Sequence, residues 1–163
     1  MNGTIFSFNM KTLLLKIWKA LPNSEILRGS LVWLIMQKFL VGVVGVVLDN
    51  SGQILFLKHT YREKYPWGLP GGWLKRGEQP MQALRREIRE ETGMDVEVIK
   101  PLIVSGDDQW PRVDLIFLCR VIDEAFSASE EVSSARFFNI DELPEIMPSQ
   151  KTIIQQVIHQ KYN

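Results

Sequence analysis

The chain has 163 residues, of which 45% are hydrophobic and 23% are charged, a balance typical of one folded domain with an apolar core. This composition excludes a largely disordered protein. Lysine and arginine together number 19, as do aspartate and glutamate, so the formal net charge is zero. We therefore expect no broad electrostatic attraction to nucleic acid or to a membrane, and any recognition of phosphate has to be local.

The first 38 residues predict two short helices ahead of the main domain. In MKTLLLKIWKALP, apolar residues recur at helical spacing, and the final proline ends the segment. Asn23 or Ser24 can cap a second helix that runs to about Gln37. We interpret residues 1–38 as an N-terminal helical extension. Packing on the main domain, a contact between two copies and a position on a membrane surface are the alternatives left open.

Two features of this region resemble export or membrane signals. The start of MKTLLLKIWKALP is similar to a signal peptide, but lysines interrupt it and no small-residue cleavage site follows closely. The run LVWLIMQKFLVGVVGVVL is about long enough to cross a bilayer, but Gln37 and Lys38 lie near its middle. We interpret this run as the end of a helix leading into a buried strand. We therefore expect no integral membrane segment and a cytoplasmic location.

From Phe39 the pattern changes to strands and one central helix. VGVVGVVLDNSGQILFLKH predicts a strand, a turn at DNSG and a second strand. The loop TYREKYP and the glycine-rich segment WGLPGGWL follow. A helix is predicted from about Pro80 to Thr92, because proline fits a first turn and Gly93 fits a C-terminal cap.

The rest of the chain alternates strands with a last helix. VEVIKPLIV, VDLIFLCRVI and SARFFNI are strand-like, and Cys119, the single cysteine, is expected to be buried in the second of them. Ser149 is expected to cap the final helix. This irregular alternation favours an α/β or α+β layer fold.

The central helix carries an unusual concentration of acidic groups. Glu87, Glu90 and Glu91 fall within roughly 100° of each other around the helix axis. One interpretation is a solvated helix with salt bridges, such as Arg86 with Glu90, worth about 0.3–0.5 kcal/mol each. However, carboxylates near a helix C-terminus are disfavoured by the helix dipole and raise one another's proton affinity. A divalent cation such as Mg²⁺ removes both penalties, so the stripe predicts a metal site.

The segment before the helix supports this hypothesis. Leu-Pro-Gly-Gly at positions 69–72 lets the backbone approach a ligand closely, because glycine has no Cβ. A glycine carbonyl in this segment can complete the shell of a metal ion.

Together these residues form a known pattern. The segment GWLKRGEQPMQALRREIREETGM, from Gly72 to Met94, resembles the Nudix box of the Nudix hydrolases. Every specified position of that 23-residue pattern is filled. The flanking hairpin, the WGLPGGW approach and the later EEVSSARFFNIDELP are also similar to the family, so the resemblance covers about residues 39–163. It implies a Nudix fold, in which a mixed β-sheet is sandwiched between helices.

The resemblance also implies an activity. Nudix hydrolases cleave the diphosphate of a nucleoside diphosphate linked to another group X, in dependence on Mg²⁺ or Mn²⁺. By motif position, the metal ligands are Glu87, Glu90 and Glu91, together with the carbonyl of Gly71. Arg86 is implied to orient these glutamates.

Two further roles follow from the resemblance. Glu78 is implied to be structural within the turn into the helix. The general base, which activates water for attack at phosphorus, is either the box residue Glu87 or a glutamate of the later loop. Glu131 is the first candidate in that loop and Glu130 the second.

Three side chains near the box are candidates for substrate binding. Arg62 and Arg112 lie in predicted loops and can hold phosphate, although solvated surface charges are the alternative. Trp67 lies beside the glycine-rich segment and can stack on a base, with core packing as its alternative.

We therefore interpret the chain as a pyrophosphohydrolase of nucleotide sugars or of ADP-ribose-type compounds. Hydrolysis of modified nucleoside triphosphates is the second interpretation, and a non-catalytic nucleotide-binding regulator is the third. The expected partner is a small-molecule nucleotide rather than a nucleic acid, and a homodimer is left open.

Overall fold

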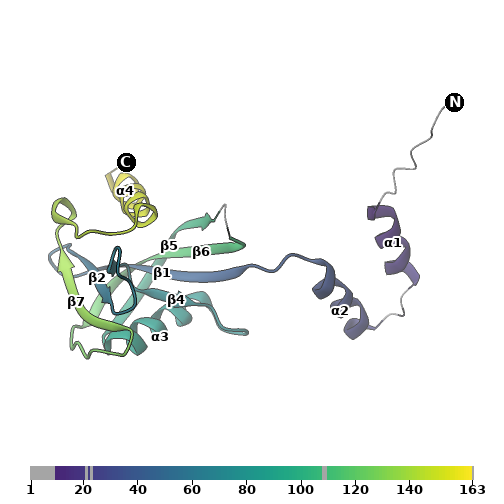
Figure 1. Cartoon of the computed structure of the whole chain (residues 1–163), viewed down its shortest axis with the longest axis horizontal. Coiled ribbons are helices and arrows are strands. Elements are labelled where there is room, and N and C mark those ends of the chain that lie inside the picture. The colour runs from purple at the N-terminus through teal and green to yellow at the C-terminus, as the bar shows by residue number, and fades with distance from the viewer. Residues whose placement is uncertain (1–9, 21, 23, 108–109, 163) are drawn as a thin grey trace. The chain divides into compact units, whose positions relative to one another are not determined.

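The computed structural model describes residues 10–107, apart from 21 and 23, and residues 110–162. The chain divides into two compact units, Met1–Lys38 and Phe39–Asn163 (Figure 1). Each unit is described by itself.

The first unit contains two helices, α1 (Met10–Ala20) and α2 (Glu25–Ile35). Ser24 occupies the N-cap position of α2 but makes no side-chain capping hydrogen bond, and the alternative cap, Asn23, lies outside the described residues. None of the helices in the described ranges is both long and apolar enough to span a membrane. The homodimer contact considered for this unit stays a prediction.

The second unit is built on one mixed sheet of seven strands. The strands are β1 (Leu40–Leu48), β2 (Ile54–His59), β3 (Trp67–Gly68), β4 (Gly71–Trp73), β5 (Asp95–Gly106), β6 (Arg112–Asp123) and β7 (Val132–Phe138). The order is β3-β2-β1-β6-β5, with β4 added on β1 and β7 added on β2. The pair β1–β6 is parallel, and the other strand pairs are antiparallel.

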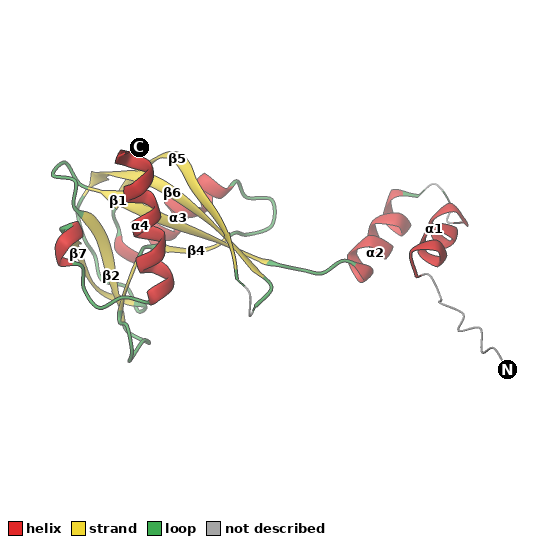
Figure 2. Ribbon diagram, turned by 90° about the horizontal axis from the view of Figure 1, so that it is seen from above, coloured by secondary structure: helices red, strands yellow, loops and turns green. Residues whose placement is uncertain are grey.

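Two helices cover opposite faces of this sheet, α3 (Pro80–Thr92) and α4 (Pro148–Tyr162) (Figures 1 and 2). The alternation of β1 explains the two layers, because successive side chains of a strand point to opposite faces. Val43 and Val47 pack in the core cluster that contains Leu84 of α3, whereas Val46 packs in the cluster that contains Ile154 of α4. The expected mixed sheet between helices is therefore confirmed.

Local signals account for the ends of several elements. The carboxylate of Asp49 accepts hydrogen bonds from the backbone N–H groups of Ser51 and Gln53, both at 2.8 Å, which confirms the predicted turn. The helix α3 starts at Pro80 and ends at Thr92. The next residue, Gly93, caps it with a φ of 74°, in the left-handed region that glycine adopts most easily. These two boundaries follow directly from turn and cap chemistry.

Two expectations for the later part of the chain had different outcomes. Cys119 is fully buried as expected, and burial raises the pKa of its thiol to about 12. The expected cap at Ser149 is wrong, because α4 already begins at Pro148. A proline has no N–H to satisfy and a φ suited to a first helical turn, so it starts the helix one residue earlier. A short 3₁₀ turn, Ile140–Glu142, precedes it.

The strand β4 brings the glycine-rich segment against β1. Gly71 pairs with Val44, and Gly72 pairs with Val43. A Cβ on Gly71 would overlap the carbonyl oxygen of Val43 and lie 3.0 Å from the Cα of Val44. Only a residue without a side chain lets the two strands approach this closely.

The substitution Gly71→Ala is expected to destabilise the domain by about 1–3 kcal/mol, because the clash is with backbone atoms that cannot rotate away. Urea unfolding measures this loss. The matched control is Gly106→Ala, where nothing lies within 4 Å of the added Cβ. Equal unfolding midpoints for the two variants would contradict this account of β4.

Candidate active site

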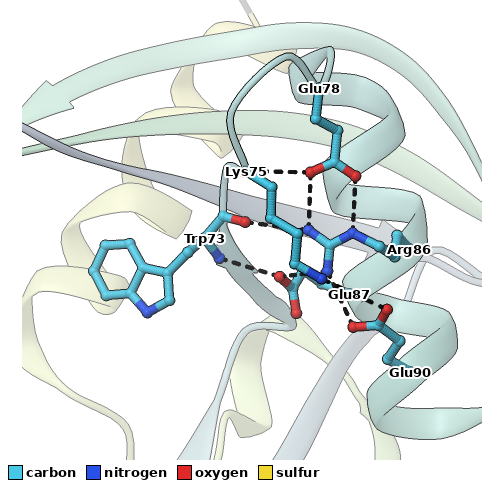
Figure 3. Close-up of polar contacts among 6 residues, drawn as sticks. All are labelled: Trp73, Lys75, Glu78, Arg86, Glu87 and Glu90. Carbon is cyan, nitrogen blue, oxygen red and sulfur yellow. Dashed lines mark hydrogen bonds and ion pairs between the residues drawn. The ribbon is translucent and has the colours of Figure 1, made fainter.

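The guanidinium of Arg86 joins three glutamates (Figure 3). Its Nε and Nη2 donate to the two oxygens of Glu78 at 2.8 and 3.0 Å. Its Nη1 donates to Glu87 at 2.7 Å and to Glu90 at 3.0 Å, so the predicted pair of Arg86 and Glu90 is confirmed. The hydrogen bonds from Arg86 hold the pKa of Glu78 at about 2, and the same contacts raise the pKa of Arg86. This arrangement fixes the acidic side of α3 to the chain that leads into it.

The turn before α3 positions Glu78 for this role. The backbone N–H of Lys75 donates to Glu78 at 3.2 Å, and Gly77 has a φ of 81° that permits the tight bend. The other two arginines of the helix, Arg85 and Arg89, point elsewhere and pair with Asp95, at 2.6 and 3.0 Å. The three arginines of α3 therefore serve two separate groups of carboxylates.

Glu87 lies close under the glycine-rich strand. Its Oε1 accepts a hydrogen bond from the backbone N–H of Trp73 at 3.3 Å, in addition to the one from Arg86. A Cβ on Gly72 would lie 2.6 Å from Oε2 of Glu87. The missing side chain at position 72 therefore leaves the space that this carboxylate occupies.

Glu91 differs from the other carboxylates of the helix. Its side chain is only 9% exposed, and its Oε2 has no hydrogen-bond partner among the described residues. Burial raises the pKa of Glu91 to about 7, a hydrogen bond from the backbone N–H of Gly71 opposes this, and the charges of Glu87 and Glu131 raise it further. An ionised Glu91 is thus a buried negative charge without sufficient compensation.

The later loop approaches the site from the end of β2. The carbonyl of Glu131 accepts a hydrogen bond from the backbone N–H of Thr60 at 2.9 Å, and the carbonyl of Glu130 accepts one from the Thr60 hydroxyl at 2.8 Å. Glu131 is exposed, and its charge acts on the pKa of Glu91. The fold therefore brings Glu131 within electrostatic range of the box, 40 residues away in sequence.

The carboxylates fit a hard divalent cation in chemistry, although two of them, Glu87 and Glu90, are hydrogen-bonded to Arg86. In the described part of the chain, no three side chains of the histidine, cysteine, aspartate or glutamate type are grouped as a preformed metal site. Glu87 and Glu90 each direct one oxygen to Arg86, whereas Glu91 has a buried oxygen without a donor. Carboxylate oxygens and backbone carbonyls are the ligands that Mg²⁺ prefers. The buried oxygen of Glu91 is of the type that such a cation binds.

The three predicted substrate-binding side chains have different surroundings. Arg62 is partly buried, its Nη1 has no partner among the described residues, and its charge lowers the pKa of Glu91. Arg112 already pairs with Asp114 at 2.8 Å, and its guanidinium lies 4.8 Å from the ring centre of Trp73. Of the three, Arg62 has the most capacity left for a ligand.

Trp67 makes the contacts expected for core packing, which was the alternative to stacking on a base. Its ring packs edge to face on Phe138, with 5.2 Å between the ring centres, and it joins the core cluster under α4. Stacking of Trp67 on a base stays a prediction.

Two polar residues lie near the site, although the sequence favours a structural role for the first, His59, and does not mark the second, Gln150. His59 is only 4% exposed, and both of its ring nitrogens are buried without a hydrogen-bond partner in the described structure. Gln150 of α4 accepts a hydrogen bond from the backbone N–H of Leu69 at 3.1 Å. A histidine at the end of an apolar strand was a weak signal for the first. No local pattern marks the second, because its partner is 81 residues away.

Comparisons with known proteins identify the family to which the chain is similar. A family model described as the NUDIX domain matches residues 38–157. A Methanocaldococcus jannaschii protein named ADP-ribose pyrophosphatase is 30% identical over 125 residues, which cover 74% of each chain. A Danio rerio protein named 8-oxo-dGDP phosphatase NUDT18 is 40% identical over 86 residues, which cover 51% of this chain and 26% of that protein.

The fold also has a solved counterpart. The crystal structure of a UDP-X diphosphatase superimposes with a TM-score of 0.65 at 23% identity, over 94% of this chain and 80% of that chain. At this identity the likeness concerns the fold alone. The family match, however, spans most of the chain and includes the complete box from Gly72 to Met94. The chain therefore belongs to the Nudix family of hydrolases.

Proposed function

We propose that this hydrolase is a divalent-cation-dependent pyrophosphohydrolase. It cleaves the diphosphate of a nucleoside diphosphate linked to another group X, of the nucleotide-sugar or ADP-ribose type, by attack of water on phosphorus. We assign this activity to residues 39–163 and regard residues 1–38 as an extension. Acting on soluble nucleotides, it is proposed to work in the cytoplasm.

The observation that carries the proposal is the buried oxygen of Glu91, which has no donor within the described structure. A structural salt-bridged helix has no reason to bury a carboxylate next to the charge of Glu87. A cation-dependent site has a reason to bury it, because a bound cation compensates the charges of both Glu87 and Glu91. The similarity to the M. jannaschii protein named ADP-ribose pyrophosphatase supports the choice of substrate class.

The proposed roles follow from the contacts of each side chain. Glu87, Glu90 and Glu91 hold the cation, with the carbonyl of Gly71 as a further ligand. When bound, Mg²⁺ or Mn²⁺ neutralises the charge that develops on the diphosphate oxygens. Arg86 holds Glu87 and Glu90 in place through hydrogen bonds of 2.7 and 3.0 Å, each to one oxygen of the carboxylate.

The general base is proposed to be Glu131 rather than Glu87. Oε1 of Glu87 already accepts hydrogen bonds from Arg86 and from the Trp73 backbone, so this oxygen is occupied in holding the helix to β4. Glu131 is exposed to water and lies on a loop beside the box. Its carboxylate can therefore accept the proton of the attacking water without breaking the contacts of Arg86.

A modified nucleoside diphosphate or triphosphate is the second candidate for the substrate. It is favoured by the 40% identity to the protein named 8-oxo-dGDP phosphatase, which covers 51% of this chain. Both candidates use the same cation site, so the two functions differ in the nucleoside and in the group X that are recognised.

The test of the function is a panel assay with Mg²⁺ or Mn²⁺. The panel contains ADP-ribose, nucleotide sugars, CDP-alcohols, dinucleoside polyphosphates, NADH, and normal and oxidised nucleoside triphosphates. Cleavage of ADP-ribose or a nucleotide sugar is expected, with a loss of roughly 100-fold or more in Glu91→Gln. The matched control, Glu145→Gln, changes an exposed glutamate outside the site and is expected to keep its activity. Equal activity of the two variants, or no cleavage of any compound, would contradict the proposal.

The raised pKa of Glu91 predicts an unusual pH dependence of stability. Between about pH 4.5 and 7 the folded protein retains a proton that the unfolded chain releases, so the metal-free protein loses stability as pH rises through this window. Ionisation at pH 8 costs at most about 3 kcal/mol. In EDTA, the melting temperature of Glu91→Gln is therefore expected to exceed that of the wild type more at pH 8 than at pH 5.

Mn²⁺ at pH 8 is expected to reverse this order, because the cation stabilises the wild type but not the variant. His59 contributes its own pH dependence below about pH 6.5, but it is present in both proteins and cancels in the comparison. If the difference in melting temperature between Glu91→Gln and the wild type stayed constant from pH 5 to 8, the pKa of Glu91 would not be raised by burial.

The base assignment predicts a separation between turnover and cation binding. Glu131→Gln is expected to lower kcat by roughly 100-fold or more, while Mn²⁺ still raises its melting temperature as in the wild type. Glu130→Gln is the neighbouring control and is expected to retain activity. If Glu131→Gln kept wild-type kcat while Glu87→Gln lost turnover but kept the response to Mn²⁺, the base would be Glu87.

A further inference from the structure

Three nitrogen-bearing side chains converge on one glycine beside the carboxylates. A Cβ on Gly68 would lie 2.7 Å from Nη1 of Arg62, 3.2 Å from Nε2 of His59 and 3.4 Å from Nε2 of Gln150. They come from β2, from the loop after it and from α4, so the fold rather than a local motif brings them together. A side chain at position 68 would fill the point on which the three nitrogens converge.

Two of the three side chains have nitrogens without acceptors. Nη1 of Arg62 and both ring nitrogens of His59 are buried without a hydrogen-bond partner among the described residues. Leaving a buried polar group unpaired costs about 1–3 kcal/mol. Gln150 uses its carbonyl oxygen for the backbone N–H of Leu69, which directs its amide nitrogen towards Gly68. The cluster therefore has donors in excess of acceptors.

The charge of the cluster selects the kind of ligand. Arg62 carries a positive charge, and burial together with that charge lowers the pKa of His59 to about 4, so the imidazole is neutral and one ring nitrogen donates. An arginine, an amide and a neutral imidazole together favour an anionic oxygen over a cation. The ring centre of Tyr61, which is 60% exposed, lies 5.3 Å from that of His59.

The position of the cluster connects it to the proposed reaction. Gly68 precedes the segment Leu69–Gly72 that leads to the box. The charge of Arg62 acts on the pKa of Glu91, so the two groups are within electrostatic range. A phosphorylated ligand bound at the carboxylates would therefore lie within the electrostatic influence of Arg62.

We propose that His59, Arg62 and Gln150 form a second, metal-independent subsite at Gly68 that binds the phosphoryl oxygens of one half of the substrate. The identity of that ligand rests on the proposed function, but the donors themselves do not depend on hydrolysis. Either half of an ADP-ribose-type substrate supplies this chemistry, the nucleoside phosphate or the sugar phosphate.

Calorimetry in EDTA tests the subsite with AMP and ribose 5-phosphate as separate probes. The decisive variant is Gln150→Glu, which keeps an oxygen for the Leu69 N–H but replaces the donor with a negative charge. The wild type is expected to bind one of the two probes, and Gln150→Glu to bind it at least tenfold more weakly. The probe that binds identifies the half of the substrate held there. The matched control is Gln155→Glu, an exposed position on the same helix, which is expected to bind like the wild type.

Gly68→Ala provides a second variant, because its methyl group would occupy the same point and is expected to cause a similar loss. Melting temperatures show which variants are folded, and either folded variant decides the question. Unchanged affinity in a folded Gln150→Glu or Gly68→Ala, or no binding of either probe to the wild type, would overturn the subsite. An inactive panel with this binding intact would instead overturn the proposed hydrolysis and leave the subsite standing.

Discussion

The geometry of the site depends on one interaction, the contact of a single arginine with three glutamates. Arg86 holds Glu78 in the turn before α3 and holds Glu87 and Glu90 on the helix itself, with hydrogen bonds of 2.7 to 3.0 Å. The guanidinium is largely shielded from water, with a side-chain exposure of 21%, so these charges interact more strongly than a surface pair does. Because Nη2 also donates to the carbonyl of Trp73, the same group connects the helix to β4. Loss of Arg86 would therefore disconnect two elements as well as expose repelling charges.

The charge of Glu91 is not compensated by Arg86, and this difference is the basis of the proposed cation binding. The backbone N–H of Gly71 is its one favourable contact from the glycine-rich segment, and it does not outweigh burial. The carboxylates held by Arg86 are stable without a further ligand, whereas Glu91 is not. A divalent cation would supply the positive charge that Glu91 lacks, and a phosphorylated substrate would supply the negative charge that Arg62 lacks. Glu91 and Arg62 lie within electrostatic range of each other, as expected for a site that binds the cation and the substrate together.

Local chemistry explains which features the sequence could predict. The turn at Asp49, the limits of α3 and the spacing of Arg86 and Glu90 all depend on residues within a few positions of each other, and the structure bears them out. The sheet between two helices followed from alternation and from the family resemblance. The convergence of Gln150 with Gly68 could not be predicted, because it depends on how α4 packs across the finished sheet. The choice between stacking and packing for Trp67 likewise required its neighbour Phe138, which is distant in sequence.

The most direct measurement of the central claim is a titration of the wild type and of Glu91→Gln with Mn²⁺ at several pH values. A cation competes with the proton on Glu91, so the affinity of the wild type should rise as pH increases through about 7, where that carboxyl ionises. The variant has no such proton to release and should bind Mn²⁺ weakly, with little change over the same range. Equal affinities of the two proteins at pH 8 would contradict the claim that the buried carboxylate of Glu91 exists to bind a cation.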